Sequence, residues 1–232
     1  MRLKDWNELP DFLKCPEVAK YYRVLSKHKI WLAGKRVTDI VIASVMLLFL
    51  AIPMAVIAVL IKLDSRGPVF FRQERVTQYG RIFRIYKFRT MVVGASELGA
   101  QVTTEHDPRI TRIGAKIRHL RMDEFPQVFN ILLGDMTLVG TRPEVPDYVK
   151  EYTPKMRATL LLPAGLTSRA SIAYKDEDAI LGQASDPDYV YIHKVLPQKM
   201  KYNLASLKKF SFLSDMSVIW DTYISVTGKN ED

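Results

Sequence analysis

Two adjacent acidic residues stand where an aspartate could react with phosphorus. Asp123 and Glu124 precede a short predicted helix, Phe125 to Leu133, whose first turn contains Pro126, a residue well tolerated there. An aspartate can attack phosphorus to give an acyl phosphate, and a neighbouring carboxylate can hold Mg²⁺, which prefers oxygen ligands. The pair also fits an ordinary helix start, because acidic residues stabilise helix N-termini. Taken alone, the two residues favour that structural interpretation.

Phosphoryl transfer also requires cations where negative charge develops. Arginine binds phosphate through two parallel hydrogen bonds, whereas lysine acts as a point charge. Candidates of both kinds lie on a predicted strand, a basic helix and a turn. They are Lys87 and Arg89 on the strand, Arg118 and Arg121 on the helix, and Arg142 in the turn. A surface charge or a lipid-headgroup contact explains each of them, taken singly, at least as well.

The bulk properties narrow the class of partner without choosing one. The chain has 232 residues, which suits one domain with a sizeable core. Its formal net charge of +9 indicates anionic partners, namely nucleic acid, phospholipid headgroups or phosphorylated substrates. The single cysteine, Cys15, excludes an internal disulfide and a cysteine-based zinc site.

One long apolar segment dominates the chain. From Ile40 to Ile61 almost every residue is apolar. At about 1.5 Å per residue, a helix of this length could cross a bilayer core of about 30 Å. A buried core helix is the alternative, but it would have to be apolar on every face in a small protein. We therefore predict that this segment inserts into a membrane.

Pro53 lies inside this segment and should kink or break the helix, because proline removes a backbone donor and clashes with the preceding turn. Positive charge flanks both ends, with Lys35 and Arg36 before the segment and Lys62 and Arg66 after it. A single span should carry its lysine and arginine excess on one side. The pattern favours a re-entrant, monotopic helix over a span.

A β-hairpin is predicted after the apolar segment. Val69 to Val76 and Arg81 to Met91 are rich in β-branched and aromatic residues and flank the short loop Thr77 to Gly80. The polar stretch that follows, with Gly94 and Gly99, is predicted to be a mobile loop.

A basic amphipathic helix is expected next. Its apolar positions recur at helical spacing, and basic residues crowd the same segment. The apolar residues are Ile110, Ile113, Ile117 and Leu120, and the basic ones are Arg109, Arg112, Lys116, Arg118, His119 and Arg121. Such a helix commonly lies among lipid headgroups, although a solvated basic face gives the same pattern. The nearby apolar segment favours the membrane surface.

The patterns together predict an α+β fold, a small helix-rich domain with one β-hairpin and an N-terminal re-entrant membrane helix broken at Pro53. We expect a polar helical leader in residues 1–34, the membrane helix in 35–66, and the main domain with a C-terminal helical region in 67–232. There is no Walker-type loop and no dinucleotide-binding fingerprint. No recognised nucleic-acid module surrounds the basic helix, so membrane lipids are the expected partner and nucleic acid is not.

Four segments in order carry a resemblance to a known family. The proline-interrupted apolar segment is followed by KLDSRGPVFFRQERV, by FRIYKFRTM and by ITRIGAKIRHLRMDEFPQVFNILLGDMTLVGTRPE. Together they closely resemble the bacterial sugar transferases, the monotopic phosphoglycosyl transferases that act as polyprenyl-phosphate hexose-1-phosphate transferases. The match runs from about Lys35 to about Leu166 and continues more loosely to the C-terminus.

The resemblance implies an enzyme at the cytoplasmic face of the bacterial inner membrane, with residues 67–232 as its catalytic domain. The family's Asp-Glu dyad corresponds to Asp123 and Glu124. In the family the aspartate attacks the sugar-bearing phosphate of a UDP-sugar, releases UMP and forms a covalent aspartyl-phosphosugar. The sugar phosphate then passes to polyprenyl (undecaprenyl) phosphate, which initiates surface polysaccharide or glycoconjugate assembly. The dyad works with Mg²⁺.

The resemblance also implies roles for single residues. Asp123 is the expected nucleophile, and Glu124 is a Mg²⁺ ligand or a general acid or base. Lys87, Arg118 and Arg142 occupy the family's phosphate-binding positions.

Some segments depart from the family pattern. Ile52-Pro53 stands where the family has Ser-Pro, so no serine hydroxyl is available to satisfy the interrupted backbone. Gly140 to Pro143 has threonine in place of the first proline of Gly-Pro-Arg-Pro, and Pro163 to Ser168 replaces Pro-Gly-(Ile/Leu)-Thr-Gly. Ser171 to Asp178 is placed at the sugar pocket by its location alone.

Two other classes of protein remain as alternatives. A non-catalytic membrane scaffold with a basic headgroup-binding face would tolerate changes at Asp123. A membrane-tethered nucleic-acid binder would show steeply salt-dependent binding. The apolar helix would also allow a homodimer within the membrane.

Overall fold

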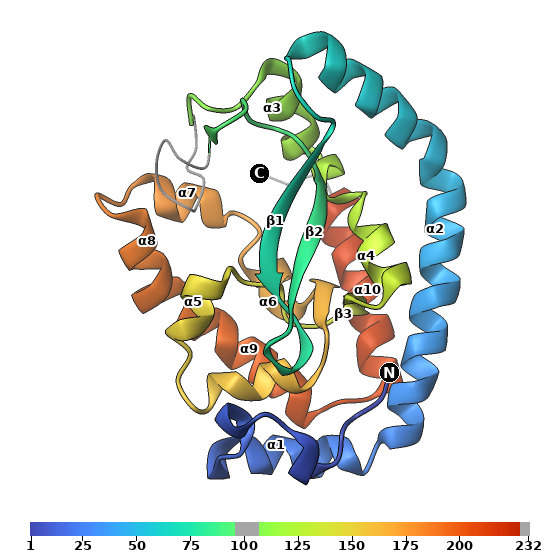
Figure 1. Ribbon diagram of the computed structural model, residues 1–232, viewed down its shortest axis with the longest axis vertical. Helices are drawn as coiled ribbons and strands as arrows, with labels where there is room; N and C mark the ends of the chain where they lie inside the picture. The colour runs from blue at the N-terminus through green and yellow to red at the C-terminus, as the bar shows by residue number, and fades with distance from the viewer. Residues whose placement is uncertain (96–106, 228–232) are drawn as a thin grey trace.

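A long helix, two small sheets and a set of shorter helices form the fold in the computed structural model, which describes residues 1–95 and 107–227 (Figure 1). The helices are α1 (Pro16–Ser26), α2 (Lys29–Asp64), α3 (Arg112–His119), α4 (Gln127–Leu133), α5 (Pro146–Lys150), α6 (Arg169–Ala173), α7 (Glu177–Gly182), α8 (Pro187–Val190), α9 (Leu196–Lys208) and α10 (Phe212–Thr227). The strands are β1 (Phe70–Val76), β2 (Ile82–Phe88), β3 (Met136–Val139) and β4 (Ala164–Thr167). The predicted helix-rich α+β class is confirmed.

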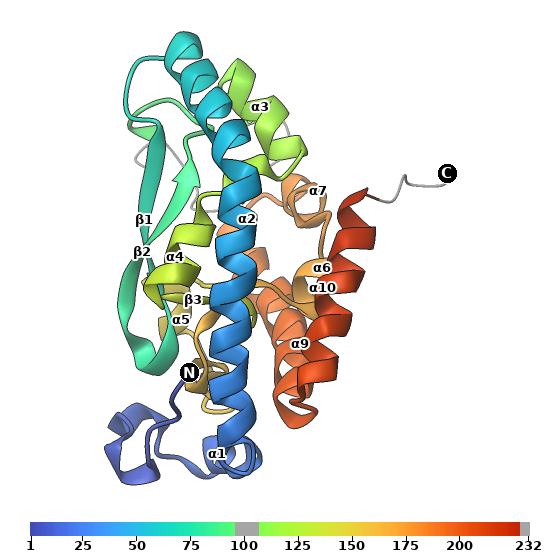
Figure 2. The ribbon, with the colours of Figure 1, turned by 90° about the vertical axis from the view of Figure 1, so that its right-hand side faces the viewer.

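Helix α2 continues through Pro53, so the predicted break is wrong for this structure. The helix is bowed and follows one side of the molecule, which is how the chain accommodates a proline that removes one backbone hydrogen bond (Figures 1 and 2). One face packs on the domain through Ala43, Met54 and Ile57, while the other exposes an apolar stripe. Residues of that stripe include Val41, Val45, Leu48, Phe49, Ile52, Val56, Val59 and Leu63. By length and composition alone, α2 could cross a membrane.

Arg36 joins α2 to the end of α4. Its guanidinium donates to the carbonyl oxygens of Ile131 at 2.6 Å and Leu132 at 3.0 Å. Carbonyls in the last turn of a helix have no partner within the helix, so Arg36 serves as their cap. Gly134 ends α4 in the left-handed conformation, with φ of 88°, and confirms the predicted stop at this residue.

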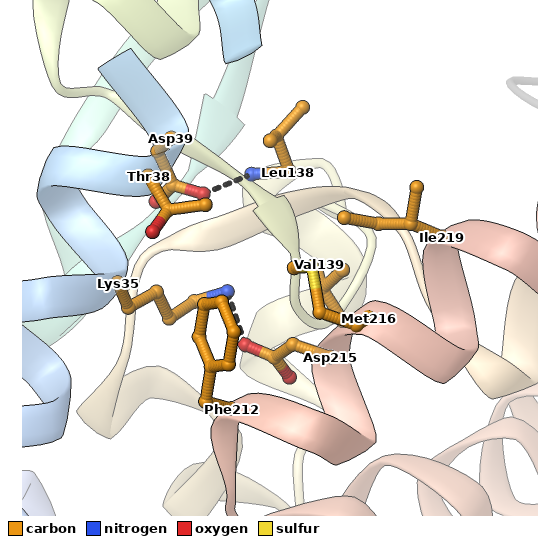
Figure 3. Close-up of a pocket in the computed structure, with 9 residues that line it drawn as sticks. All are labelled: Lys35, Thr38, Asp39, Leu138, Val139, Phe212, Asp215, Met216 and Ile219. Atoms are coloured by element: carbon orange, nitrogen blue, oxygen red, sulfur yellow. Dashed lines mark hydrogen bonds and ion pairs between the residues drawn. The ribbon is translucent and has the colours of Figure 1, made fainter. Parts of the chain in front are cut away.

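A second set of polar contacts fixes α2 to β3 and α10 (Figure 3). The Lys35 ammonium donates to the Asp215 carboxylate at 2.6 Å. Asp39, only 2% exposed, accepts from the Thr137 hydroxyl at 2.6 Å and from the Leu138 amide at 3.1 Å. Lys35 was expected to flank a membrane segment, but its charge is instead paired inside the protein.

The predicted hairpin is confirmed. β1 and β2 pair antiparallel from Phe70 opposite Phe88 to Val76 opposite Ile82. The connecting turn includes Tyr79 and Gly80, both at positive φ. The loop expected after Met91, with Gly94 and Gly99, falls largely on residues 96–106, which lie outside the described part.

The sequence reasoning missed a second sheet, in which β3 and β4 pair in parallel. Two glycines, Gly140 just after β3 and Gly165 within β4, allow the two backbone segments to approach closely. A Cβ atom on Gly165 would lie 2.2 Å from the backbone nitrogen of Gly140. The Gly140 amide donates to the Thr167 carbonyl at 3.0 Å, and the Gly165 amide donates to the Thr141 carbonyl at 2.8 Å. This close approach fixes the turn that carries Arg142.

Residues 1–28 pack against the C-terminal helices. Their buried side chains share one core cluster with residues of α9 and of the 3₁₀ turn Met156–Leu161. That cluster contains Leu3, Leu9, Leu13, Val18, Leu25, Leu160, Leu161, Met200, Leu204 and Leu207. The leader boundary at residue 34 and the helix boundary at residue 66 stay predictions.

Candidate active site

The acidic pair lies in a 3₁₀ turn, Met122–Glu124, between α3 and α4. Arg121 adopts the left-handed conformation, with φ of 56°, and redirects the chain after α3. Met122 and Phe125 pack on the cluster that contains Phe88 of β2. Apolar packing on either side of the pair thus holds Asp123 and Glu124 against the hairpin.

Glu124 is bound by two cations from different elements. The Lys87 ammonium donates to Oε1 at 2.8 Å. The Arg142 guanidinium donates to Oε1 at 2.5 Å and to Oε2 at 3.3 Å. Burial by itself raises the pKa of Glu124, but Arg142 and Lys87 outweigh it and hold that pKa well below its ordinary value. Glu124 is therefore ionised at neutral pH.

Asp123 has a different environment from its neighbour. The residue is 7% exposed, and no described residue donates a hydrogen bond to its carboxylate. Burial raises its pKa above the ordinary value, and Lys87 opposes that shift. The N-cap position of α4 is Pro126, and Asp123 makes no capping hydrogen bond. Asp123 consequently does not act as the helix cap that the structural interpretation required.

The side chains of Arg118 and Arg121 interact with different groups although the two residues are only three positions apart. Arg118, near the end of α3, lies close enough to Asp123 to lower its pKa. Arg121 donates instead to the Lys175 carbonyl at 2.5 Å, beyond α6. Only Arg118 of these two is placed by the structure to act on the acidic pair directly.

Arg89, the residue after β2, contacts the segment that follows α2. Its guanidinium donates to the Ser65 carbonyl at 2.8 Å, to the Ser65 hydroxyl at 2.9 Å and to the Arg66 carbonyl. These contacts join the hairpin to the C-terminus of α2. The structure thus brings Lys87, Arg118 and Arg142 together at the pair and places Arg89 and Arg121 in supporting contacts.

Sequence reasoning missed Arg75 on β1. Its guanidinium donates to the Pro143 carbonyl at 3.1 Å and to the Gln73 side chain at 2.6 Å, so it supports the turn that carries Arg142. Strand register could have identified it. Phe71 is opposite Lys87, and Arg75, four residues further along the strand, shares that face.

The sequence predicts Mg²⁺ at the acidic pair, Asp123 and Glu124. The described residues contain no group of three or more histidine, cysteine, aspartate or glutamate side chains suited to a metal. Mg²⁺ needs fewer protein ligands, because it commonly binds one or two carboxylates and completes its shell with water and substrate phosphate. The carboxylate of Asp123, which accepts from no residue in the described part of the chain, fits such a ligand, whereas both oxygens of Glu124 already accept from cations.

Comparison with known proteins identifies the family of the chain. Residues 30–229 match the family model described as "Bacterial sugar transferase". The chain is 37% identical over 191 residues to "UDP-N-acetylgalactosamine-undecaprenyl-phosphate N-acetylgalactosaminephosphotransferase" of Aeromonas hydrophila, which covers 81% of this chain and 42% of that protein. It is 47% identical over 123 residues to "Putative undecaprenyl-phosphate N-acetylgalactosaminyl 1-phosphate transferase" of Bacillus subtilis (strain 168), covering 53% of this chain and 68% of that protein.

A third relative is matched over nearly its whole length. "Exopolysaccharide production protein PSS" of Rhizobium leguminosarum bv. phaseoli is 34% identical over 202 residues, which is 82% of this chain and 94% of that protein. The chain spans less than half of the Aeromonas relative and about two thirds of the Bacillus one. On the extent of these matches, the chain belongs to the bacterial sugar transferase family.

Proposed function

We propose that the chain is a phosphoglycosyl transferase that moves a sugar-1-phosphate from a UDP-sugar to undecaprenyl phosphate and releases UMP. The names of the Aeromonas and Bacillus relatives describe transfer to undecaprenyl phosphate, and the Rhizobium relative is named for exopolysaccharide production. The reaction would initiate a surface polysaccharide or glycoconjugate. The observation that carries the proposal is the contrast between Asp123, to whose carboxylate no described residue donates, and Glu124, which two cations hold.

The reaction takes two displacements at one phosphorus atom. A carboxylate oxygen of Asp123 attacks the phosphorus that bears the sugar, and the bond from that phosphorus to UMP breaks. UMP leaves with the electron pair, and the sugar phosphate stays on Asp123 as an acyl phosphate. A phosphate oxygen of undecaprenyl phosphate then attacks the same phosphorus, which restores the Asp123 carboxylate and forms a sugar-bearing diphosphate lipid.

The cations at the acidic pair suit both steps. Lys87 and Arg142 already bind a carboxylate, and a donor diphosphate offers the same kind of oxygen ligand. Arg118 adds positive charge near Asp123. The carboxylate of Asp123 would hold Mg²⁺, and Glu124 would join it once the donor diphosphate takes over Lys87 and Arg142, which now bind Glu124. The bound ion would supply further positive charge to the diphosphate. The low pKa of Glu124 suits a metal ligand better than a general acid.

Helix α2 supplies the membrane attachment, and we propose that both of its ends lie at the same membrane face, as the predicted monotopic arrangement requires. Arg36 binds α4 near one end of the helix, and at the other end Asp64 accepts from the Ile113 amide of α3 at 2.9 Å. A helix that spans a bilayer has its ends on opposite faces, whereas one domain contacts both ends of α2. The exposed apolar stripe between those ends would face lipid at the cytoplasmic side of the inner membrane.

The test is UMP release by the detergent-purified chain with undecaprenyl phosphate, Mg²⁺ and a panel of UDP-sugars. Without acceptor, donor labelled in the sugar-bearing phosphate should transfer its label to the protein, and Asp123→Asn should take up none. Release that depends on one or a few sugars and stops on chelation would support the proposal. No release with any donor, beside an active relative, would favour the non-catalytic scaffold.

A further inference from the structure

A series of buried polar side chains connects the turn that carries Arg142 to the start of α7. Glu144, two residues after Arg142, accepts from the Tyr191 hydroxyl at 2.7 Å. The Lys199 ammonium donates to the Tyr191 oxygen at 3.1 Å and to Oε2 of Glu177 at 2.7 Å. Lys199 is only 3% exposed. A buried ammonium is costly unless its hydrogen bonds are met, so these contacts restrict where Glu177 can lie.

Tyr191 is the branching residue of this series. It opens the π-helical turn Tyr191–Val195 between α8 and α9, and π-helical turns frequently occur at functional sites. Its ring also packs 4.9 Å from the ring of Tyr148. Burial, followed by Glu144, raises the pKa of Tyr191 well above its ordinary value. The hydroxyl thus keeps its proton and remains a donor to Glu144.

Glu177 lies at the edge of the candidate active site. Its negative charge is one of those that raise the pKa of Arg142, after the larger contribution of Glu124. Two residues before Glu177, the Lys175 carbonyl accepts from Arg121, which itself stands two residues before Asp123. Two contacts therefore hold the start of α7, namely Arg121 with the Lys175 carbonyl and Lys199 with Glu177.

One carboxylate oxygen of Glu177 is available to a ligand. Oε2 binds Lys199, and no described residue donates a hydrogen bond to Oε1. The Glu177 side chain is 22% exposed, so solvent reaches it. A carboxylate next to a diphosphate site would repel phosphate oxygens, and an uncharged hydroxyl donor is the group that suits it.

The arrangement of the helices indicates which substrate would meet this residue. Helices α7 and α8 lie on the side of the molecule opposite α2 (Figure 1). With α2 in the membrane, a water-soluble donor approaches from the α7 side, whereas a lipid acceptor arrives along α2.

We propose that Glu177 accepts a hydrogen bond from a hydroxyl group of the donor's sugar, and that Lys199 and Tyr191 position it. This inference rests on the proposed function and adds to it a residue that contacts the sugar. Hydroxyl groups also occur on the ribose of the nucleotide, so the test must separate the two sources.

The test compares binding of UDP-sugar with binding of UDP by isothermal titration. All variants carry Asp123→Asn so that the donor is not consumed. Glu177→Gln keeps the shape of the side chain and removes its charge, and Glu151→Gln, at an exposed carboxylate after α5, is the matched control. Because a hydrogen bond to a charged group is at stake, we expect Glu177→Gln to weaken UDP-sugar binding roughly tenfold. UDP binding should not change.

The positioning residues have their own variants. Lys199→Met and Tyr191→Phe should reproduce the selective loss to a smaller extent, and Lys199→Arg should restore binding relative to Lys199→Met. If Lys199→Met does not fold, Tyr191→Phe carries this part of the test, because it keeps the buried ring. Wild-type binding in a folded Tyr191→Phe variant would overturn the positioning role.

The remaining outcomes separate this assignment from the proposed function. Equal loss of UDP and UDP-sugar binding in Glu177→Gln would indicate a ribose or phosphate role and overturn the sugar contact. Unchanged binding of both ligands would overturn it as well. A wild-type chain that binds UDP-sugar through Glu177 but releases no UMP would overturn the proposed function and leave this assignment standing.

Discussion

Asp123 and Glu124 are adjacent in the chain, yet among the contacts of the described residues cations bind Glu124 and not Asp123. Lys87 and Arg142 both donate to its Oε1 atom, whereas no described residue donates to the Asp123 carboxylate. The two pKa shifts differ in the same way, since that of Glu124 is lowered and that of Asp123 is raised. Neighbouring carboxylates with such different environments are suited to different tasks, one as a nucleophile and one as a fixed anion.

Asp123→Asn should abolish turnover while the chain stays folded. The amide keeps the shape of the carboxylate but cannot form the acyl phosphate. We expect UMP release to fall roughly a thousandfold or more, with a melting temperature no lower than that of the wild type. Near-normal release by this variant would refute the nucleophile assignment.

Glu124→Gln should destabilise the chain as well as reduce its activity. The substitution leaves Lys87 and Arg142 without their shared anion in a poorly solvated place, which we expect to cost about 2–4 kcal/mol in the free energy of unfolding. Added UMP should restore part of this loss, since its phosphate replaces the missing charge. Chemical denaturation with and without UMP measures both effects.

Glu151→Gln is the control for Glu124→Gln. Glu151→Gln, at an exposed position, should change the unfolding free energy by no more than about 0.5 kcal/mol. An equal stabilisation by UMP in wild type and Glu124→Gln would show that the nucleotide phosphate does not replace the carboxylate.

The stability effect of Asp123→Asn should depend on pH. Burial raises the pKa of Asp123 above 3.8, so the folded chain holds this proton more tightly than the unfolded chain. The unfolding free energy therefore falls as pH rises through the interval between the two pKa values. Since asparagine removes this term, the variant should exceed the wild type in stability at neutral pH. The two should converge below pH 3.8.

Denaturation of both proteins across a pH series measures that difference. Each unit between the folded and unfolded pKa corresponds to about 1.4 kcal/mol. A difference that grows towards acid would contradict the raised pKa. The contribution of Glu124 to the unfolding free energy depends on pH in the opposite direction. Because its pKa is lowered in the folded chain, this contribution is lost as pH falls below 4.5 towards the pKa of the folded state.

Both ends of α2 should be reached from the cytoplasm. Ile30 and Arg66 are exposed near its two ends, and single cysteines can be placed there after Cys15→Ser removes the native thiol. We expect an impermeant maleimide to label both positions in inverted membrane vesicles and neither in intact cells, because one domain contacts both ends of the helix. Labelling of the two positions from opposite sides would establish a span.

Local patterns in the sequence predicted the elements that depend on local physics. Segments rich in β-branched and aromatic residues on both sides of a short loop predicted the hairpin, and Gly134 marked the end of α4. The acidic pair and three of its cations were also found, although the family resemblance, rather than spacing, connected Lys87 and Arg142 to it.

The features that sequence reasoning missed depend on contacts between distant segments. β3 and β4 have four residues each and pair across 24 intervening residues, so neither strand has a periodic pattern of its own. Lys35 and Arg36 resembled membrane-flanking charges, and only the folded chain shows that Asp215 and the carbonyls of α4 bind them. The role of Arg75, which supports the turn of Arg142 through the Pro143 carbonyl, could be inferred only once the strand register was known.

The contacts of Arg36 and Asp39 have a consequence for the proposed lipid substrate. They join α2 to α4, which follows the acidic pair in the chain, and to β3, which leads to the turn that carries Arg142. With α2 seated in the bilayer, the folded protein fixes the height of Asp123 above the lipid surface. A carrier phosphate, held at the headgroup plane by its own tail, then needs to search for its target in only two dimensions.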